Sequence, residues 1–178
     1  MTKSKYILVT GGAGYIGSHT CVELVSQGYI PVILDDFSNS HRSTVGLIES
    51  ITGKQLLVQE GNCTDRSLLE VLFRTYSFGG VVHFAASKAV GESVENPLLY
   101  YENNINALVY LLQELQQLEE VCFIFSSSCT VYGQAEIMPI RENAPIQKAL
   151  SPYGNTKQIG EEIIQDVAKE IIASYDSS

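Results

Sequence analysis

Short runs of apolar residues alternate along the chain with longer segments in which apolar positions recur at helical spacing. The runs predict strands at 6–10, 31–34, 55–59, 81–84 and 121–126. The intervening segments predict helices at 15–27, 44–51, 67–76, 97–118 and 153–174, with Gly79 and Gly80 as the stop of the third. Continuous apolar strands separated by helices are typical of a parallel sheet covered on both faces. We therefore expect an α/β fold with a doubly wound parallel sheet in the strand order 3-2-1-4-5.

The amino-acid composition is that of a globular protein with one core. The chain has 178 residues, of which 45% are apolar, and a formal net charge of −9. This length supplies one domain-sized core, and the acidic charge disfavours nucleic acid and anionic membranes as partners. The apolar run at 6–9 is too short for a signal peptide or a membrane span, so we expect a cytoplasmic protein. Scattered cysteines, far in sequence from the histidines, predict reduced thiols and neither a disulfide framework nor a metal site.

The segment 10–17, with the sequence TGGAGYIG, follows the first predicted strand and opens the first predicted helix. Gly11, Gly14 and Gly17 allow a tight turn, a close approach of the backbone to a pyrophosphate and close packing of the helix on the strand. The N-terminus of the helix adds amide donors and a positive dipole for the phosphates. The glycines in this strand-to-helix setting predict a dinucleotide-binding loop rather than an incidental turn.

Two carboxylates, Asp35 and Asp36, stand at the end of the second predicted strand. A carboxylate at this place accepts hydrogen bonds from the hydroxyls of the adenosine ribose and repels a 2′-phosphate. The pattern therefore favours NAD over NADP as the cofactor. His41 and Arg42 point the other way, because an arginine near the ribose can accommodate that phosphate. We interpret Arg42 as a solvated loop residue.

A run of serines follows the fifth predicted strand, at 126–128. The carboxyl ends of parallel strands form the ligand crevice of such a sheet, and a serine there can hold a substrate oxygen. A polar transition from strand to loop would have the same composition. The serines alone therefore leave both interpretations open.

Tyr153 and Lys157 are four residues apart in the last predicted helix and share one face of it. A free tyrosine titrates near ~10, and moving its pKa to ~7 requires about 4 kcal/mol of preferential stabilisation of the phenolate. A fixed cation nearby supplies that stabilisation, so the pair predicts a proton acceptor for a hydroxyl group. The same spacing also arises by chance on an ordinary helix face.

In chain order, the strand, glycine loop, serine run and Tyr-x-x-x-Lys pair resemble the extended short-chain dehydrogenase/reductase superfamily. Within it the chain is similar to the UDP-glucose 4-epimerases, through TGGAGYIGS at 10–18, SNS at 38–40, HFAASKAVGES at 83–93, YYENN at 100–104, SSSCTVYG at 126–133 and SPYGNTK at 151–157. The resemblance covers essentially the whole chain. It implies a Rossmann-type NAD-binding domain over 1–178 that lacks the C-terminal strands and the substrate domain of full-length relatives.

The resemblance also implies a reaction. Tyr153, as the phenolate, takes the proton from the C4 hydroxyl of a UDP-hexose while a hydride passes from C4 to the nicotinamide of tightly bound NAD. The 4-keto sugar then turns over and receives the hydride on its other face, so UDP-glucose and UDP-galactose interconvert. Lys157 lowers the pKa of Tyr153 and binds the nicotinamide ribose, and Ser128 hydrogen-bonds the reacting oxygen.

The cofactor-binding residues implied by the resemblance are Gly11, Gly14, Tyr15, Ile16, Gly17, Asp35, Asp36, Asn39, Ser40, Asn62, Cys63, Phe84, Ala85, Lys88, Asn103, Tyr153 and Lys157. The family commonly has an aspartate near the adenine where this chain has Asn62, whose amide oxygen can still accept from the adenine amino group. Related dehydratases carry an Asp-Glu pair where this chain has Cys129 and Thr130. These two residues offer no acid or base for removing water, so dehydration is disfavoured.

Three hypotheses for the function follow. In the first, the chain is the N-terminal part of an epimerase and is inactive or weakly active alone. In the second, it is an NAD-binding module or paralogue without catalysis. In the third, it is an NAD-dependent reductase of a small carbonyl compound. The intact Ser128, Tyr153 and Lys157 argue against the second hypothesis, and the segment 90–93, VGES, has no role in the third. Relatives often dimerise through two long helices, so the resemblance also implies a homodimer.

Overall fold

The computed structural model describes residues 4–118, 121–135 and 137–176. The chain divides into two compact units: the first contains Met1–Ala86 and Asn106–Ser126, and the second contains Ser87–Ile105 and Ser127–Ser178. The long helix α5 (Pro97–Leu115) contributes its first part to the second unit and its remainder to the first. The strands lie in the first unit, and the helix that carries the Tyr-x-x-x-Lys pair lies in the second.

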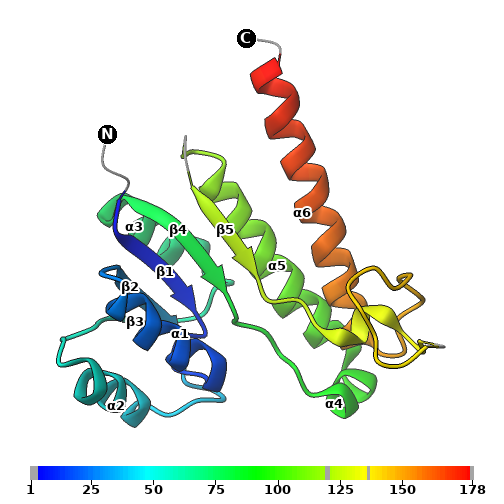
Figure 1. The fold of residues 1–178 in the computed structure, drawn as a ribbon, viewed down its shortest axis with the longest axis horizontal. Helices are drawn as coiled ribbons and strands as arrows, with labels where there is room; N and C mark the ends of the chain where they lie inside the picture. Colours follow the sequence, from blue (N-terminus) through cyan, green and yellow to red (C-terminus); the bar gives the residue numbers. More distant parts are fainter. Residues whose placement is uncertain (1–3, 119–120, 136, 177–178) are drawn as a thin grey trace. The chain divides into compact units, whose positions relative to one another are not determined.

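The first unit is built on a five-stranded sheet in which all neighbouring strands are parallel, in the order β3-β2-β1-β4-β5 (Figure 1). Its strands are β1 (Tyr6–Thr10), β2 (Ile30–Asp35), β3 (Leu57–Glu60), β4 (Phe78–His83) and β5 (Cys122–Phe125). The register places Thr10 beside both Leu34 and His83, so the carboxyl ends of β2, β1 and β4 meet at one edge. The predicted doubly wound parallel sheet and its strand order are confirmed.

One face of the sheet is covered by α1 (Tyr15–Ser26) and α2 (Ser43–Thr52). The core beneath these helices contains Ile7 and Val9, two positions apart in β1, with Ile33 of β2 and Val82 of β4. Cys21 of α1, Ile48 of α2 and Leu56, just before β3, complete it. The period of two follows from the pleat of a strand, which sends neighbouring side chains to opposite faces.

The opposite face is covered by α3 (Arg66–Thr75) and the latter part of α5. After β3 the chain resumes on the other side of β1, and right-handed crossovers then place the following helices on the other face of the sheet. The strand residues Leu8 and Val81 are buried on this side. The guanidinium of Arg66 lies 5.1 Å from the ring centroid of Tyr110, which joins α3 to α5.

The second unit contains α4 (Val90–Glu95), the first part of α5, the 3-10 helix η1 (Cys129–Tyr132) and α6 (Pro152–Asp176). The sequence pattern does not predict α4 or η1, because helices of one or two turns give too little periodicity. In the described part of the predicted loop 134–151, the chain forms turns and bends and neither a helix nor a strand. Throughout the described ranges, no helix combines the length and the apolar character needed to cross a bilayer.

The prediction that Gly79 and Gly80 end the helix at 67–76 is wrong, because both residues lie inside β4. Helix α3 ends at Thr75 and is followed by extended backbone. A Cβ on Gly79 would lie 2.3 Å from the carbonyl oxygen of Ser4, so this strand position has room only for glycine. The glycine pair thus serves close packing of backbone against backbone rather than chain termination.

Most of the other boundaries shift by one to three residues, and two of these shifts stand out. The third strand begins at Leu57 rather than two residues earlier. The backbone N–H of Leu56 donates to the carboxylate of Glu49 at 2.9 Å instead of joining the sheet, so a side chain in α2 sets this boundary. The helix predicted to continue to 118 ends at Leu115.

Replacing Gly79 by alanine is expected to lower the free energy of unfolding by about 1–3 kcal/mol, because the new methyl group must displace the backbone near Ser4. Gly46→Ala is the matched control, since nothing lies within 4 Å of the added Cβ in the middle of α2. Its expected effect is a gain of up to about 1 kcal/mol from helix propensity. Urea denaturation of both variants measures the difference, and equal stability of Gly79→Ala and wild type would contradict the packing argument.

Candidate functional site

The glycine loop in the first unit joins β1 to α1 and is closed by contacts between backbone atoms. A Cβ on Gly17 would lie 2.3 Å from the carbonyl oxygen of Gly11, and a Cβ on Gly11 would lie 2.8 Å from the amide nitrogen of Ala85. Gly11 also has a φ of 68°, in the left-handed region that favours glycine. Gly14 caps α1 and accepts from the N–H of Ser18 at 2.9 Å. The loop therefore has the tight turn and the close helix packing that its sequence predicts.

The N-terminus of α1 lies at the surface of the unit. The side chains of Tyr15 and Ile16, in its first turn, are 80% and 59% exposed. The first amides of a helix have no partners within the helix and carry its positive dipole end. This end of α1 is consequently open to an anionic group such as a pyrophosphate.

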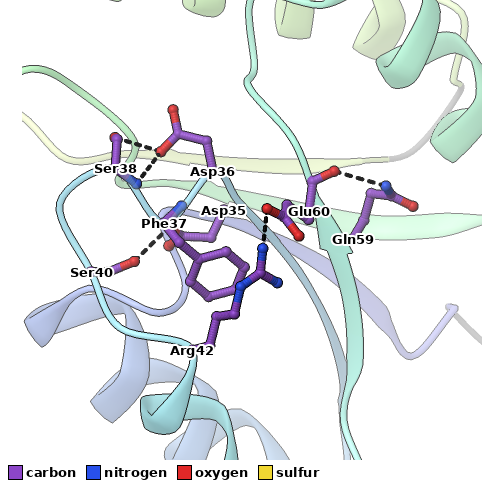
Figure 2. A network of polar contacts seen from close by, with 8 residues as sticks. All are labelled: Asp35, Asp36, Phe37, Ser38, Ser40, Arg42, Gln59 and Glu60. Atoms are coloured by element: carbon purple, nitrogen blue, oxygen red, sulfur yellow. Dashed lines mark hydrogen bonds and ion pairs between the residues drawn. The ribbon is translucent and has the colours of Figure 1, made fainter.

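Asp35 ties the glycine loop to the carboxyl end of β2. One carboxylate oxygen accepts from the N–H of Ala13 at 2.9 Å. The other accepts from the N–H of Phe37 at 3.0 Å and from Ser40 Oγ at 2.8 Å (Figure 2). The side chain is 8% exposed, so these donors hold a largely buried anion. Asn39 lies in the same turn and is exposed.

Asp36 and Asn62 form a second polar pair at the ends of β2 and β3. Asp36 accepts from Ser38 through N–H and Oγ and from Asn62 Nδ2 at 2.9 Å. Burial opposes ionisation of Asp36, but the hydrogen bonds from Ser38 and Asn62 outweigh it and hold its pKa below the ordinary value. The amide oxygen of Asn62 already accepts from the N–H and Oγ1 of Thr64. The adenine contact expected of that oxygen would compete with both of these bonds.

Cys63 follows Asn62 and is buried, with 4% of its surface exposed. Burial raises the pKa of its thiol to about 12. The side chain is thus a neutral part of the core. If Cys63 contacts a cofactor as predicted, the contact would come from its backbone.

Phe84 and Ala85 continue from β4 and lie directly against the glycine loop. Both of their N–H groups donate to the carbonyl oxygen of Thr10, at 3.0 and 3.1 Å. Thr10 Oγ1 in turn lies 2.7 Å from His83 Nδ1, and both side chains are buried. The first unit therefore brings together the glycine loop, the carboxylates after β2 and the Phe84–Ala85 segment, as the sequence predicts for one end of a dinucleotide.

Tyr153 and Lys157 lie in the first two turns of α6 in the second unit. The helix begins at Pro152, a residue suited to the first helical position. The Ser151 side chain accepts from the N–H of Gly154 at 3.1 Å and so caps this end of the helix. The predicted helical spacing is confirmed, and it places the phenol and the ammonium on one face.

Lys157 is buried, with 4% of its surface exposed. Burial lowers the pKa of its ammonium group from 10.5 to about 8, because the charged form loses hydration. At neutral pH the group is therefore still mostly protonated.

Ser128 immediately precedes η1 and caps it. Its Oγ accepts from the N–H of Thr130 at 3.3 Å and from Thr130 Oγ1 at 3.0 Å, so donation of its own hydroxyl proton is compatible with both bonds. η1 packs on α6, where a Cβ on Gly154 would lie 3.2 Å from Thr130 Cβ. This contact places the Ser128 turn at the same end of α6 as Tyr153.

Asn104 links the segment at Ser87 to helix α6 through hydrogen bonds, a role that the sequence motifs do not predict. Its Oδ1 accepts from the N–H of Ser87 at 2.8 Å, and its Nδ2 donates to the carbonyl oxygen of Ser87 at 3.0 Å and to Thr156 Oγ1 at 3.1 Å. Thr156 donates to the carbonyl oxygen of Tyr153 at 2.7 Å. Asn104 thus fixes the turn next to the exposed Lys88 relative to the helix that carries Tyr153 and Lys157.

A signal for Asn104 does exist in the sequence. It lies midway between Tyr100 and Leu108, both fully buried, at the four-residue spacing of one helix face. An amide in an apolar stripe must find partners, so it marks a polar junction inside the core. Its neighbour Asn103, a predicted cofactor residue, donates to Asn104 Oδ1 at 3.0 Å and to Ser87 Oγ at 3.3 Å.

Another contact that the sequence did not reveal joins Ser127 to Glu161, which hydrogen-bond through their side chains. Glu161 lies one turn beyond Lys157 on α6, so the serine run is fastened to the same helix. Within the described parts of the chain, no group of three or more His, Cys, Asp or Glu residues is arranged to hold a metal ion. The second unit thus places the Ser128 turn, Tyr153 and the buried Lys157 at one end of α6.

Comparison with protein-family models shows a match over residues 8–173 to the family described as GDP-mannose 4,6 dehydratase. Among curated proteins, the UDP-glucose 4-epimerase of Yersinia pestis is 48% identical over 162 residues, which are 91% of this chain and 48% of that protein. The chain therefore spans about half the length of the curated relatives it matches.

Solved structures give the same result. The UDP-glucose 4-epimerase from Bifidobacterium longum, in complex with NAD+ and UDP, matches with a TM-score of 0.88 and 41% identity, over 91% of this chain and 48% of that one. The enzyme from Stenotrophomonas maltophila, with bound NAD and formylated UDP-arabinopyranose, matches with a TM-score of 0.88 and 42% identity, over 93% and 49%. At this level of identity, both the fold and the family are shared.

Gly17→Ala is expected to weaken NAD binding by about tenfold or more, because the new methyl group collides with the Gly11 carbonyl and opens the turn. Isothermal titration calorimetry with NAD measures the effect, with Gly46→Ala as the control that leaves the loop intact. Unchanged NAD affinity in folded Gly17→Ala would contradict the assignment of this loop.

Lys157→Met is expected to change how stability depends on pH. The native lysine has a pKa of about 8 and the unfolded one about 10.5, so the wild-type chain gains stability as pH rises through this window. The gain is on the order of 3 kcal/mol, and it is absent from the methionine variant. Urea denaturation at pH 7 and pH 10.5 on both proteins isolates this effect, because the other titrating groups are common to both. Parallel pH dependences would show that Lys157 is not buried as a cation.

Proposed function

The chain belongs to the GDP-mannose 4,6 dehydratase family, and from this premise we propose that it is the NAD-binding, N-terminal half of a UDP-glucose 4-epimerase. The observation that carries the proposal is the capped start of α6, which holds Tyr153, the buried cation of Lys157 and the Ser128 turn together. The epimerases that match at 43–48% identity support the same reaction.

The residues of the first unit fit the adenosine and pyrophosphate portions of NAD. The glycine loop has no space for a Cβ at Gly11 or Gly17, as a backbone that must approach a pyrophosphate requires. Asp35 and Asp36 are carboxylates at the end of β2, suited to ribose hydroxyls. We propose that Tyr15, Ile16, Asn39, Ser40, Asn62, Cys63, Phe84 and Ala85 complete this part of the site.

The residues of the second unit would hold the nicotinamide end. Lys88 follows Ser87 in the chain, and Asn103 donates to Ser87 Oγ beside the junction that Ser87 makes with Asn104. Lys157 follows Thr156, which Asn104 also contacts. NAD, when bound, would supply the hydride acceptor and donor for the sugar carbon. Since net redox is zero, we propose that NAD stays bound between turnovers.

Tyr153 would take the proton from the sugar C4 hydroxyl and return it after the keto sugar has turned. Lys157, cationic at neutral pH, would stabilise the phenolate that this role requires. Ser128 would donate to the oxygen that becomes the carbonyl, since its Oγ acts as acceptor in its contacts with Thr130. The two hydroxyl groups and the cation together would account for proton transfer at the C4 oxygen.

Cys129 and Thr130 separate this proposal from the reaction in the family's description. Removal of water needs an acid and a base next to the substrate, and this chain lacks the Asp-Glu pair that related dehydratases carry at these two positions. Thr130 is also committed to Ser128 through both of its donors. We therefore infer epimerisation rather than dehydration.

We propose that the residues that bind UDP lie in the half of these relatives that the match does not cover. The substrate would be a UDP-hexose, and a homodimer and a cytoplasmic location remain part of the proposal. A module without catalysis and a reductase of small carbonyl compounds are the competing functions. Binding of NAD, turnover of UDP-galactose and oxidation of NADH by small carbonyl compounds separate the three.

The purified 178-residue chain is expected to bind NAD and to show little or no conversion of UDP-galactose to UDP-glucose. Tyr153→Phe should keep NAD affinity within about threefold, because it removes only the phenolic oxygen. Calorimetry and a coupled UDP-glucose assay measure both quantities. Absence of NAD binding would contradict the proposal, robust epimerisation would show that this half suffices, and NADH oxidation by small ketones or aldehydes would favour the reductase.

A further inference from the structure

Arg42 lies beside the proposed ribose site and is held there by two groups of the same unit. Its guanidinium forms an ion pair with the carboxylate of Glu60 and lies 4.6 Å from the ring centroid of Phe37 (Figure 2). A guanidinium in the segment that follows Asp35 and Asp36 is the group that a 2′-phosphate would need. Its engagement by Glu60 therefore bears directly on the choice between NAD and NADP.

The pairing of β2 with β3 brings Glu60 to the end of β2, where Arg42 contacts it. Glu60, the last residue of β3, is paired in register with Asp35, the last residue of β2. The N–H of Gly61 donates to the carbonyl oxygen of Asp35 at 3.1 Å, which keeps the two strand ends together. The carboxylate of Glu60 is thereby presented at the same edge as the predicted ribose acceptors.

The ring of Phe37 makes the second contact of the Arg42 guanidinium. It has a φ of 56°, an uncommon value for a bulky residue, and its N–H donates to Asp35 at 3.0 Å. The hydrogen bond to the carboxylate offsets the strain of this backbone and turns the aromatic ring towards Arg42. Stacking on a ring leaves the edge of a guanidinium free for planar hydrogen bonding, and Glu60 occupies that edge.

We propose that Glu60 is a specificity-determining residue, which holds and neutralises Arg42 so that no free cation receives the 2′-phosphate of NADP. The inference rests on the proposed dinucleotide function of this unit. The side chains of Arg42 and Glu60 are 63% and 51% exposed, so water and salt screen the pair. Its effect on nucleotide choice is consequently modest, and it adds to the repulsion from Asp35 and Asp36.

Glu60→Gln is the direct test, measured as the ratio of the dissociation constants for NADP and NAD with the full 178-residue chain. The ratio is expected to fall by about 3- to 10-fold at low ionic strength, with NAD affinity unchanged, because the released guanidinium pairs with the phosphate. The gain should shrink at about 0.5 M salt. Both dissociation constants are measured on the same variant, so any effect of the substitution on folding cancels in their ratio.

Two further variants assign the effect to Arg42. In Arg42→Leu/Glu60→Gln the gain for NADP should disappear. Glu70→Gln is the matched control, because Glu70 also forms an exposed ion pair with an arginine, Arg74 at 3.8 Å, but lies on α3. It should leave the ratio unchanged.

An unchanged ratio in Glu60→Gln would overturn the inference while leaving the dinucleotide proposal intact. So would a gain that persists in the double variant, since Glu60 would then act by repulsion alone and not through Arg42. A wild-type chain that binds neither nucleotide contradicts the proposed function itself, and this inference with it.

Discussion

The hydrogen bond from the N–H of Ala13 to the buried carboxylate of Asp35 is the interaction on which the first unit's site depends. It fixes the glycine loop to the end of β2, and the same carboxylate orders the following turn through Phe37 and Ser40. A single anion thus determines the loop that would take the phosphates, the edge that would take the ribose and the position of the ring beneath Arg42. Losing this carboxylate would loosen all three at once.

The sequence predicts the sheet well because its strands are buried on both faces and so appear as continuous apolar runs. The first strand, Tyr6–Thr10, agrees residue for residue with the structure. Predictions failed where a tertiary contact sets the local conformation. Gly79 lies in a strand because its backbone packs on Ser4, and the third strand starts late because Glu49 takes an N–H from it. Neither contact leaves a periodic pattern in the sequence.

In the candidate site, too, the features set by local spacing could be predicted and those set by tertiary contacts could not. The Tyr153–Lys157 spacing could be interpreted at once, because a helix face has a fixed period. The burial of Lys157 and the junction at Asn104 could not, since both depend on segments far apart in the sequence meeting in the second unit. Asn104 was nevertheless detectable as an amide within an apolar stripe. Buried polar positions on otherwise apolar helix faces are therefore worth searching for alongside motifs.

We propose that NAD binds the first unit through the glycine loop and Asp35. A crystal structure of the chain grown with NAD tests this proposal most directly. The pyrophosphate is expected at the N-terminus of α1 and the adenosine ribose at the carboxylates that end β2, Asp35 and Asp36. A pyrophosphate bound away from the glycine loop, or an adenosine ribose bound away from these carboxylates, would contradict it.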